Sequence, residues 1–207
     1  MIKNWELKTE LCEIMTRHGS DKGSGHHNYT VLYDYLFSKL RNKEINLLEI
    51  GIGTTNPNIP SNMGEDGVVG ASLRAWKEYF PKGKIYGADI DHDILFEEER
   101  IKTIYCDQTS EISLKLMSKE LNQTYDIIID DGYQNFFANY NTAINCLGSL
   151  KENGIYIIED IKKPDLSNYT PELLSNLKSR FDLKSIEIVE PPNKRNDYDN
   201  RILLILR

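Results

Sequence analysis

The sequence is poor in cysteine, and its few cysteines lie far apart. Its 207 residues include only Cys12, Cys106 and Cys146, with no Cys-x-x-Cys pair. An odd number of widely spaced cysteines argues against a disulfide framework and predicts free thiols in a reducing compartment. Without a Cys-x-x-Cys pair, a structural zinc site is not expected.

Long apolar runs and an excess of positive charge are also missing. No stretch approaches the roughly 20 apolar residues of a membrane span, and the first residues contain no apolar core of a secretion signal. The net charge is −7, whereas general nucleic-acid binding requires a basic face. We therefore expect a cytoplasmic protein with no membrane insertion and no nucleic-acid partner.

The residues that are present predict one α/β domain. Hydrophobic residues make up 40% and charged residues 28%, a globular mixture. Nearly continuous apolar segments alternate with helical patterns, which indicates right-handed βαβ units in a doubly wound sheet. We expect strands at 45–50, 84–91, 101–105, 125–132, 154–160, 183–189 and 202–206, and helices at 5–18, 31–40, 72–80, 110–121, 135–150 and 171–181.

Two polar segments interrupt this pattern. Residues 19–29 are rich in glycine and contain Asp21, Lys22, His27 and Tyr29, and residues 54–70 contain two prolines and three glycines. Long loops in a compact domain are usually functional or disordered. We expect both to close over a site and to exclude water from it.

Acidic residues follow each of the first five strands. One such acid could simply cap a helix. Because the carboxyl ends of parallel strands meet at one edge of a doubly wound sheet, acids after all five strands predict a shared site there. These residues are Glu49, Asp89, Asp107, the pair Asp130-Asp131 and the pair Glu159-Asp160.

The glycines after the first strand narrow the class of cofactor. Gly51 and Gly53 are not followed by the third glycine of a dinucleotide fingerprint, since position 56 is asparagine, and no Gly-Lys-Ser/Thr P-loop is present. A nucleoside without phosphate fits better. Asp89 could hold ribose hydroxyls, and Asp107-Gln108 could reach an adenine amine.

At this point the chain resembles the class I S-adenosylmethionine-dependent methyltransferases, and more narrowly the macrocin-type sugar O-methyltransferases. The matching segments cover residues 20–160. They are Ser20-Asp21-Lys22-Gly23 with His27-x-Tyr29, Leu48-Glu49-Ile50-Gly51-Ile52-Gly53, Ser72-Leu73-Arg74-x-Trp76, Ile85-Tyr86-Gly87-x-Asp89-Ile90, Asp107-Gln108, Ile129-Asp130-Asp131-Gly132 and Ile158-Glu159-Asp160.

The resemblance implies a fold and two cofactors. The fold is a Rossmann-like, mainly parallel seven-stranded sheet with helices on both faces and an antiparallel last strand. It forms one domain over 1–207, with N-terminal helices and a lid loop in 1–41 and the core sheet in 42–207. S-adenosylmethionine would contact Glu49, Gly51, Gly53, Ser72, Arg74, Asp89, Ile90, Asp107, Gln108 and Asp130. Asp130, Glu159 and Asp160 would hold Mg²⁺, which prefers carboxylate oxygens.

One position departs from the family pattern. The relatives follow Asp-Asp-Gly with a small residue and a histidine taken as general base, whereas this chain has Tyr133 and Gln134. Glutamine cannot accept a proton at neutral pH. Three explanations stay open: the chain has lost activity, another residue such as His27, His92 or Tyr133 is the base, or the acceptor needs none. The expected catalytic residues are Asp130, Tyr133, Gln134 and His27.

The expected activity is methyl transfer from S-adenosylmethionine to oxygen. The acceptor would be a sugar hydroxyl or an anionic, phosphate- or phosphoramidate-type oxygen on a sugar-linked group. It would belong to a bacterial capsule or surface polysaccharide or to a glycosylated metabolite. The alternatives are a non-catalytic S-adenosylmethionine-binding relative and a nicotinamide-dependent reductase. The sequence leaves a homo-oligomer open.

Overall fold

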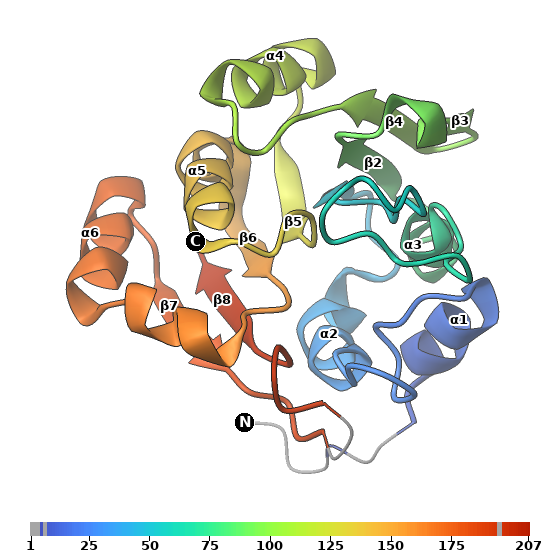
Figure 1. Ribbon diagram of the computed structural model, residues 1–207, viewed down its shortest axis with the longest axis horizontal. Coiled ribbons are helices and arrows are strands. Elements are labelled where there is room, and N and C mark those ends of the chain that lie inside the picture. The colour runs from blue at the N-terminus through green and yellow to red at the C-terminus, as the bar shows by residue number, and fades with distance from the viewer. Residues whose placement is uncertain (1–4, 6–7, 194–195) are drawn as a thin grey trace.

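The computed structural model describes residues 5, 8–193 and 196–207, and in them one mixed sheet is covered by helices on both faces (Figure 1). The strand order is β3-β4-β2-β1-β5-β6-β8-β7. The strands are β1 Asn46–Ile50, β2 Lys84–Asp89, β3 Glu97–Glu98, β4 Ile101–Tyr105, β5 Tyr125–Asp130, β6 Leu150–Ile158, β7 Ser185–Val189 and β8 Ile202–Leu206.

The strand pairing agrees with the Rossmann-like expectation. Strands β4, β2, β1, β5 and β6 are parallel neighbours, and β8 runs antiparallel to β6 and β7. All seven expected strands are present. The eighth, β3, pairs two residues with β4 and is too short to give a periodic signal in the sequence.

The helices divide between the two faces of the sheet. One face carries α1 Glu10–His18, α2 Thr30–Phe37 and α3 Ala71–Tyr79, and the other carries α4 Glu111–Leu121, α5 Phe136–Cys146 and α6 Pro171–Phe181 (Figure 1). Short 3₁₀ turns span η1 Ser38–Leu40, η2 His92–Ile94, η3 Leu147–Ser149 and η4 Lys163–Asn168. Among the described residues no helix is long and apolar enough to cross a bilayer.

Helix and strand ends are where the sequence prediction was least accurate. Residues 6–7 of the expected 5–18 helix lie outside the described residues, and α1 begins only after Thr9, whose side chain accepts a hydrogen bond from the Cys12 N–H. The expected 135–150 helix ends at Cys146, and β6 begins four residues early, at Leu150. Its polar start, Lys151 to Asn153, concealed this extension.

Alternation along the central strands builds two separate cores. Leu47, Ile127 and Ile129 pack with α1–α3, whereas Leu48 and Ile128 pack with α4 and α5. Because both faces are covered, these strands are apolar at nearly every position. The same alternation decides on which side of the sheet the acids at the strand ends lie.

The turn after β1 brings two strand ends unusually close. Gly51 has φ +88°, and a Cβ atom there would lie 2.2 Å from the Asp131 carbonyl oxygen. The Gly51 N–H donates to the Ala88 carbonyl, and the Asp131 N–H donates to the Ile50 carbonyl. Only glycine fits at position 51, so the ends of β2, β1 and β5 meet at one edge.

Candidate active site

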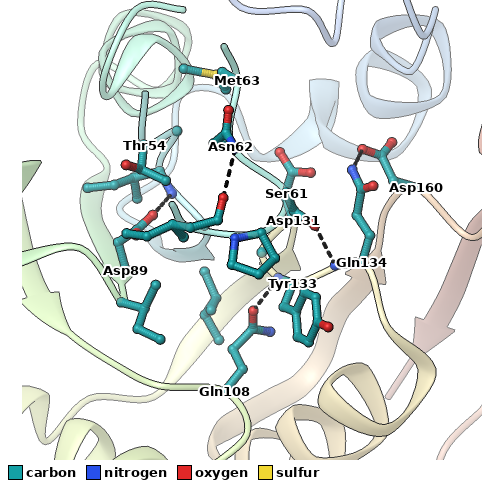
Figure 2. Close-up of a pocket in the computed structure, with 18 of the residues that line it drawn as sticks. Thr54, Ser61, Asn62, Met63, Asp89, Gln108, Asp131, Tyr133, Gln134 and Asp160 are labelled. Carbon is teal, nitrogen blue, oxygen red and sulfur yellow. Dashed lines mark hydrogen bonds between the residues drawn. The ribbon is translucent and has the colours of Figure 1, made fainter. Parts of the chain in front are cut away.

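A cavity of about 320 Å³ opens at the carboxyl edge of the parallel strands (Figure 2). Asp89 stands on one side of it, and Asp131 and Asp160 stand on the other. Its wall includes most of the residues expected at the cofactor: Gly51, Gly53, Ser72, Asp89, Ile90, Asp107 and Gln108. The 54–70 segment contributes Thr54, Ile59 to Met63 and Val68.

Asp89, at the end of β2, is fixed by backbone donors. Its Oδ2 accepts from the Ile52 N–H at 2.8 Å, and its Oδ1 accepts from the Asp91 N–H at 2.9 Å. Burial raises the pKa of Asp89 above its ordinary value, against the opposing effect of these hydrogen bonds. Each oxygen keeps a second lone pair, so the carboxylate can accept hydrogen bonds from a diol in the cavity.

Gln108 connects three parts of the site. Its Nε2 donates to Asp130 Oδ1 at 2.5 Å and to Thr142 Oγ1 on α5 at 3.0 Å, and its Oε1 accepts from the Tyr133 N–H at 2.7 Å. A Cβ on Gly132 would lie 1.9 Å from this Oε1. The amide therefore fixes the loop after β5, and only part of it faces the cavity.

Three carboxylates converge on the opposite side. One ligand atom from each of Asp131, Glu159 and Asp160 lies within 4.8 Å of the other two. Burial raises the pKa of all three, and the neighbouring Glu159 charge helps to raise that of Asp160 to about 8. Asp160 also has φ +53°, a strained backbone for a residue other than glycine.

The structure corrects one expected metal ligand, because Asp131 and not Asp130 belongs to this cluster. Along β5 the Asp130 side chain lies on the α5 face, where its oxygens accept from Gln108 Nε2 and, at 3.2 Å, from Asn139 Nδ2. Burial raises the pKa of Asp130 to about 6. Asp130 is therefore a buried anchor that does not line the cavity.

A buried ammonium lies among the acids. Lys22, 1% exposed, donates to Asp131 Oδ2 and to Glu159 Oε2 at 2.8 Å, and its Nζ lies 3.3 Å from Glu49 Oε1. Burial alone would lower the pKa of Lys22, but the surrounding carboxylates raise it well above its ordinary value. Lys22 therefore stays charged and links the 19–29 segment to the ends of β1, β5 and β6.

Asp160 is held by side chains from two sides. The Tyr29 hydroxyl donates to its Oδ1 at 2.7 Å, and Gln134 Nε2 donates to its Oδ2 at 2.7 Å. His27 Nδ1 lies 3.5 Å from Asp160 Oδ1, and His27 stacks on Tyr29. Burial lowers the pKa of His27, so its imidazole is neutral near pH 7.

Besides Asp130, five of the residues considered for the site are not in the cavity wall: His27, Glu49, Arg74, His92 and Glu159. Glu49 is fully buried behind it, where its Oε2 accepts from Trp76 Nε1 at 2.7 Å. Arg74 pairs with Glu98 and donates to the Val69 carbonyl at 2.7 Å, so it supports the 54–70 segment from outside. His92 stacks on Tyr105, with the ring centroids 4.1 Å apart, away from the acids. The expected residues Tyr133 and Gln134, in contrast, do line the cavity.

Sequence reasoning assigned no specific role to Lys22 or Asp131. Lys22 gave a signal only as part of Ser20-Asp21-Lys22-Gly23, and Asp131 gave one as the second acid of a doublet. Lys22 and Asp131 line the cavity together with Asp160. Glu159, the third acid of the cluster, is not among the lining residues. Only the folded structure shows that Lys22 meets Asp131 and Glu159, which are more than 100 residues away in the sequence.

The acid cluster fits a hard divalent cation. It offers only carboxylate oxygens, the ligands that Mg²⁺ prefers. Within the part of the chain that the structure describes, it sets four carboxylates, with Glu49, against one ammonium, and Glu49 Oε1 is buried there without a hydrogen-bond donor. The excess negative charge is the reason that a cation would stabilise the ionised cluster.

No family model matches the chain, but individual proteins do. It is 36% identical over 156 residues to demethylmacrocin O-methyltransferase of Streptomyces fradiae, covering 74% of this chain and 37% of that enzyme. It is 32% identical over 206 residues to mycinamicin VI 2''-O-methyltransferase of Micromonospora griseorubida, covering 94% and 49%. The chain thus spans half or less of the length of these curated relatives.

A solved structure agrees with this result. The MycE methyltransferase from the mycinamycin biosynthetic pathway, in complex with Mg and SAH, matches with a TM-score of 0.72 and 26% identity, over 96% of this chain and 55% of that one. The sheet order, the glycine turn and the acids at the strand ends had led to the same fold. The chain is a homologue of the macrocin-type sugar O-methyltransferases and has the fold of the S-adenosylmethionine-dependent methyltransferases.

Proposed function

We propose that this protein is an S-adenosylmethionine-dependent O-methyltransferase that modifies a sugar-linked acceptor with the help of Mg²⁺. The observation that carries the proposal is the division of one cavity into two sides. A wall suited to a nucleoside, around Asp89, faces an acid cluster suited to a cation, around Asp131 and Asp160 (Figure 2). The MycE structure, which contains Mg and SAH, supports this assignment.

The nucleoside side would bind the methyl donor through fixed groups. Asp89 accepts the ribose hydroxyls with the lone pairs that its two backbone donors leave free. Gly51 and Gly53, both with φ near +90°, let the backbone approach the methionine part. Asp107 and the exposed part of Gln108 lie where an adenine amine would be recognised.

The acid side would bind the cation and orient the acceptor. Asp131, Glu159 and Asp160 are the ligands, and Tyr29, Tyr33 and Gln134 hold two of them through hydrogen bonds. When bound, Mg²⁺ supplies a positive charge that lowers the pKa of a nearby hydroxyl. The rest of the rate enhancement would come from holding the acceptor oxygen in position against the methyl group.

The acceptor is proposed to be a sugar or a group attached to one. The curated relatives are named for methyl transfer to sugars of antibiotics such as mycinamicin VI and rhamnosyl tetracenomycin-C. The expected capsule or surface-polysaccharide setting has no support among them. An anionic oxygen is the second candidate acceptor, because Gln134 lines the cavity at the position for which the family resemblance implies a histidine, and an anion needs no base.

The test is an acceptor screen that follows S-adenosylhomocysteine release with and without Mg²⁺. Neutral sugars, their phosphate esters and glycosylated small molecules are compared on the wild type and on Asp89→Ala, which removes the ribose partner. Release that requires an acceptor and is lost in the variant is expected. Calorimetric binding of S-adenosylmethionine with no release for any acceptor would favour the non-catalytic alternative, which Gln134 also supports.

Two further expectations belong to the same proposal. Residues 1–207 form one catalytic domain, in which 1–41 contribute helices and a lid loop and 42–207 contribute the sheet. A homo-oligomer is compatible with it, and size-exclusion chromatography with light scattering measures this directly. A nicotinamide-dependent reductase has no support, since Asn56 replaces the third glycine of its fingerprint.

A further inference from the structure

The acid cluster contains a cation position that is formed by the protein itself. The Lys22 ammonium is surrounded by oxygens of Glu49, Asp131 and Glu159, which follow three different strands or lie at their ends. Its side chain is 1% exposed, and that of Glu49 is fully buried. Glu49 Oε1 finds no hydrogen-bond donor among the described residues, so the Lys22 charge is what compensates it.

The two cation positions share ligands but differ in their third acid. Asp131 and Glu159 contact Lys22, and they also belong with Asp160 to the group whose ligand atoms lie within 4.8 Å of one another. Glu49 takes part only at the Lys22 position, and Asp160 only at the other. This arrangement of four carboxylates resembles a two-cation site in which one cation is covalently attached to the chain.

Charge counting explains why the attached cation matters. With all four carboxylates ionised, they and Lys22 carry a net charge of −3, which one divalent ion reduces to −1 and a second would turn to +1. Without Lys22 the net charge is −4, and two divalent ions neutralise it. At separations of about 4 Å in a buried site, such differences change ion affinities by orders of magnitude.

We propose that Lys22 occupies one of two cation positions in the acid cluster and thereby limits the cluster to a single divalent ion, bound by Asp131, Glu159 and Asp160. Lys22 is then a positioning residue that keeps Asp131 and Glu159 turned toward that ion. The inference rests on the magnesium part of the proposed function. It also explains why a lysine of the 19–29 segment is buried against Asp131 and Glu159, which are more than 100 residues away in the sequence.

The test counts bound Mn²⁺, a paramagnetic substitute for Mg²⁺, by calorimetry and by electron paramagnetic resonance on the full chain. We expect one ion per chain in the wild type, two in Lys22→Ala and one in Lys22→Arg, which restores the charge. Lys151→Ala is the matched control, because Lys151 also pairs with an aspartate, Asp126, but lies outside the cavity wall. It should bind one ion.

The outcomes separate the two claims. One ion in Lys22→Ala, or two in Lys22→Arg or in the wild type, overturns the role of Lys22 and leaves the proposed function intact. No ion in the wild type overturns the magnesium part of the proposed function and this inference with it. If Lys22→Ala is unfolded in EDTA, Mn²⁺ should restore a cooperative melting transition, and failure to do so counts against the inference.

Discussion

The amide of Gln134 is held at an acid that should carry a cation. Gln134 Nε2 donates to Asp160 Oδ2 at 2.7 Å, its N–H donates to Ser61 Oγ at 3.2 Å, and its carbonyl accepts from Lys162 Nζ at 3.2 Å. The first contact holds the side chain and the other two hold the backbone, and none of them lets the amide take a proton. Gln134 therefore orients Asp160, but it cannot act as the general base that a histidine at this position would supply.

Restoring the family histidine tests which acceptor the site suits. On a neutral sugar hydroxyl, we expect Gln134→His to raise kcat at least tenfold, because a positioned general base contributes roughly 10²–10⁴-fold. On an anionic acceptor the same variant should gain nothing. Gln134→Asn, an amide with a shorter reach, is the control in both assays. A large gain on the natural acceptor would contradict the anionic version.

The side chains of Asp130 and Asp131 lie on opposite faces of the sheet, and we expect them to have different roles. We expect Asp131→Asn to weaken Mn²⁺ binding at least tenfold with little loss of stability. Asp130→Asn should instead cost about 1–3 kcal/mol in the free energy of unfolding, because it disturbs buried hydrogen bonds to Gln108 and Asn139. Calorimetry with Mn²⁺ and thermal melting measure the two effects, and the reverse pattern would refute the correction.

The sequence located this doublet but not the direction of its side chains. Period-two alternation says that Asp130 and Asp131 face opposite sides of β5, and it does not say which side holds the cluster. That choice depends on Asn139 of α5 and on Lys22, whose positions relative to β5 are tertiary facts. The acids could be predicted from local pattern, and their partners could not.

At the scale of elements, two long loops help to enclose the cavity at the edge of the sheet. The 19–29 segment between α1 and α2 is anchored by Lys22, and the 54–70 segment between β1 and α3 contributes one wall. Arg74, on the first turn of α3, binds the end of the second segment through the Val69 carbonyl and stacks on Phe96 at 4.5 Å. We therefore expect Arg74 to affect binding of the proposed cofactor only indirectly.

This indirect role can be measured. We expect Arg74→Ala to lower the melting temperature by a few degrees, since it removes a partly exposed ion pair with Glu98 and a stacking contact. S-adenosylhomocysteine affinity should fall less than tenfold. Asp89→Ala is the comparison and should lose far more affinity. Equal losses of affinity in the two variants would return Arg74 to the cofactor site.

The elements themselves were largely predictable. Apolar runs buried on both faces revealed seven strands, and helical patterns between them revealed the helices. The misses were β3 and the 3₁₀ turns η2 and η4, which are too short or too polar to show a period. The sequence did not show that Arg74 lies outside the cavity wall, because a family motif gives a position in the chain and not the direction of a side chain.

At the scale of the whole molecule, the fold concentrates buried negative charge at one edge. The wall suited to a nucleoside, the acid cluster and both polar segments lie along the same ends of β1, β2, β4, β5 and β6. The sequence predicted this gathering because parallel strands place their carboxyl ends together. It could not predict the free-energy cost of burying these acids in their charged form, which depends on how deeply each carboxyl is buried.

That cost predicts how stability depends on pH and on Mg²⁺. Burial raises the pKa of Asp130 to about 6 and, with the Glu159 charge, that of Asp160 to about 8, whereas the unfolded chain has values near 4. Between these limits the folded protein binds more protons than the unfolded chain. The free energy of unfolding therefore falls as pH rises, by about 1.4 kcal/mol per unit of pKa shift for each group.

Between pH 5 and pH 8 the two groups together lose about 5 kcal/mol of stability in EDTA. We therefore expect the melting temperature to drop by roughly 10–20 °C, because 1 kcal/mol shifts it by about 2–4 °C in a domain of this size. Millimolar Mg²⁺ should reduce the drop, since the ion binds only the folded, ionised cluster. Asp131→Asn, which removes one of these acids, should show a smaller drop in EDTA and little response to Mg²⁺. A melting temperature that is flat or rises over this range in EDTA would mean that the buried acids are already compensated by the protein, and that the edge of the sheet has no need of a divalent ion.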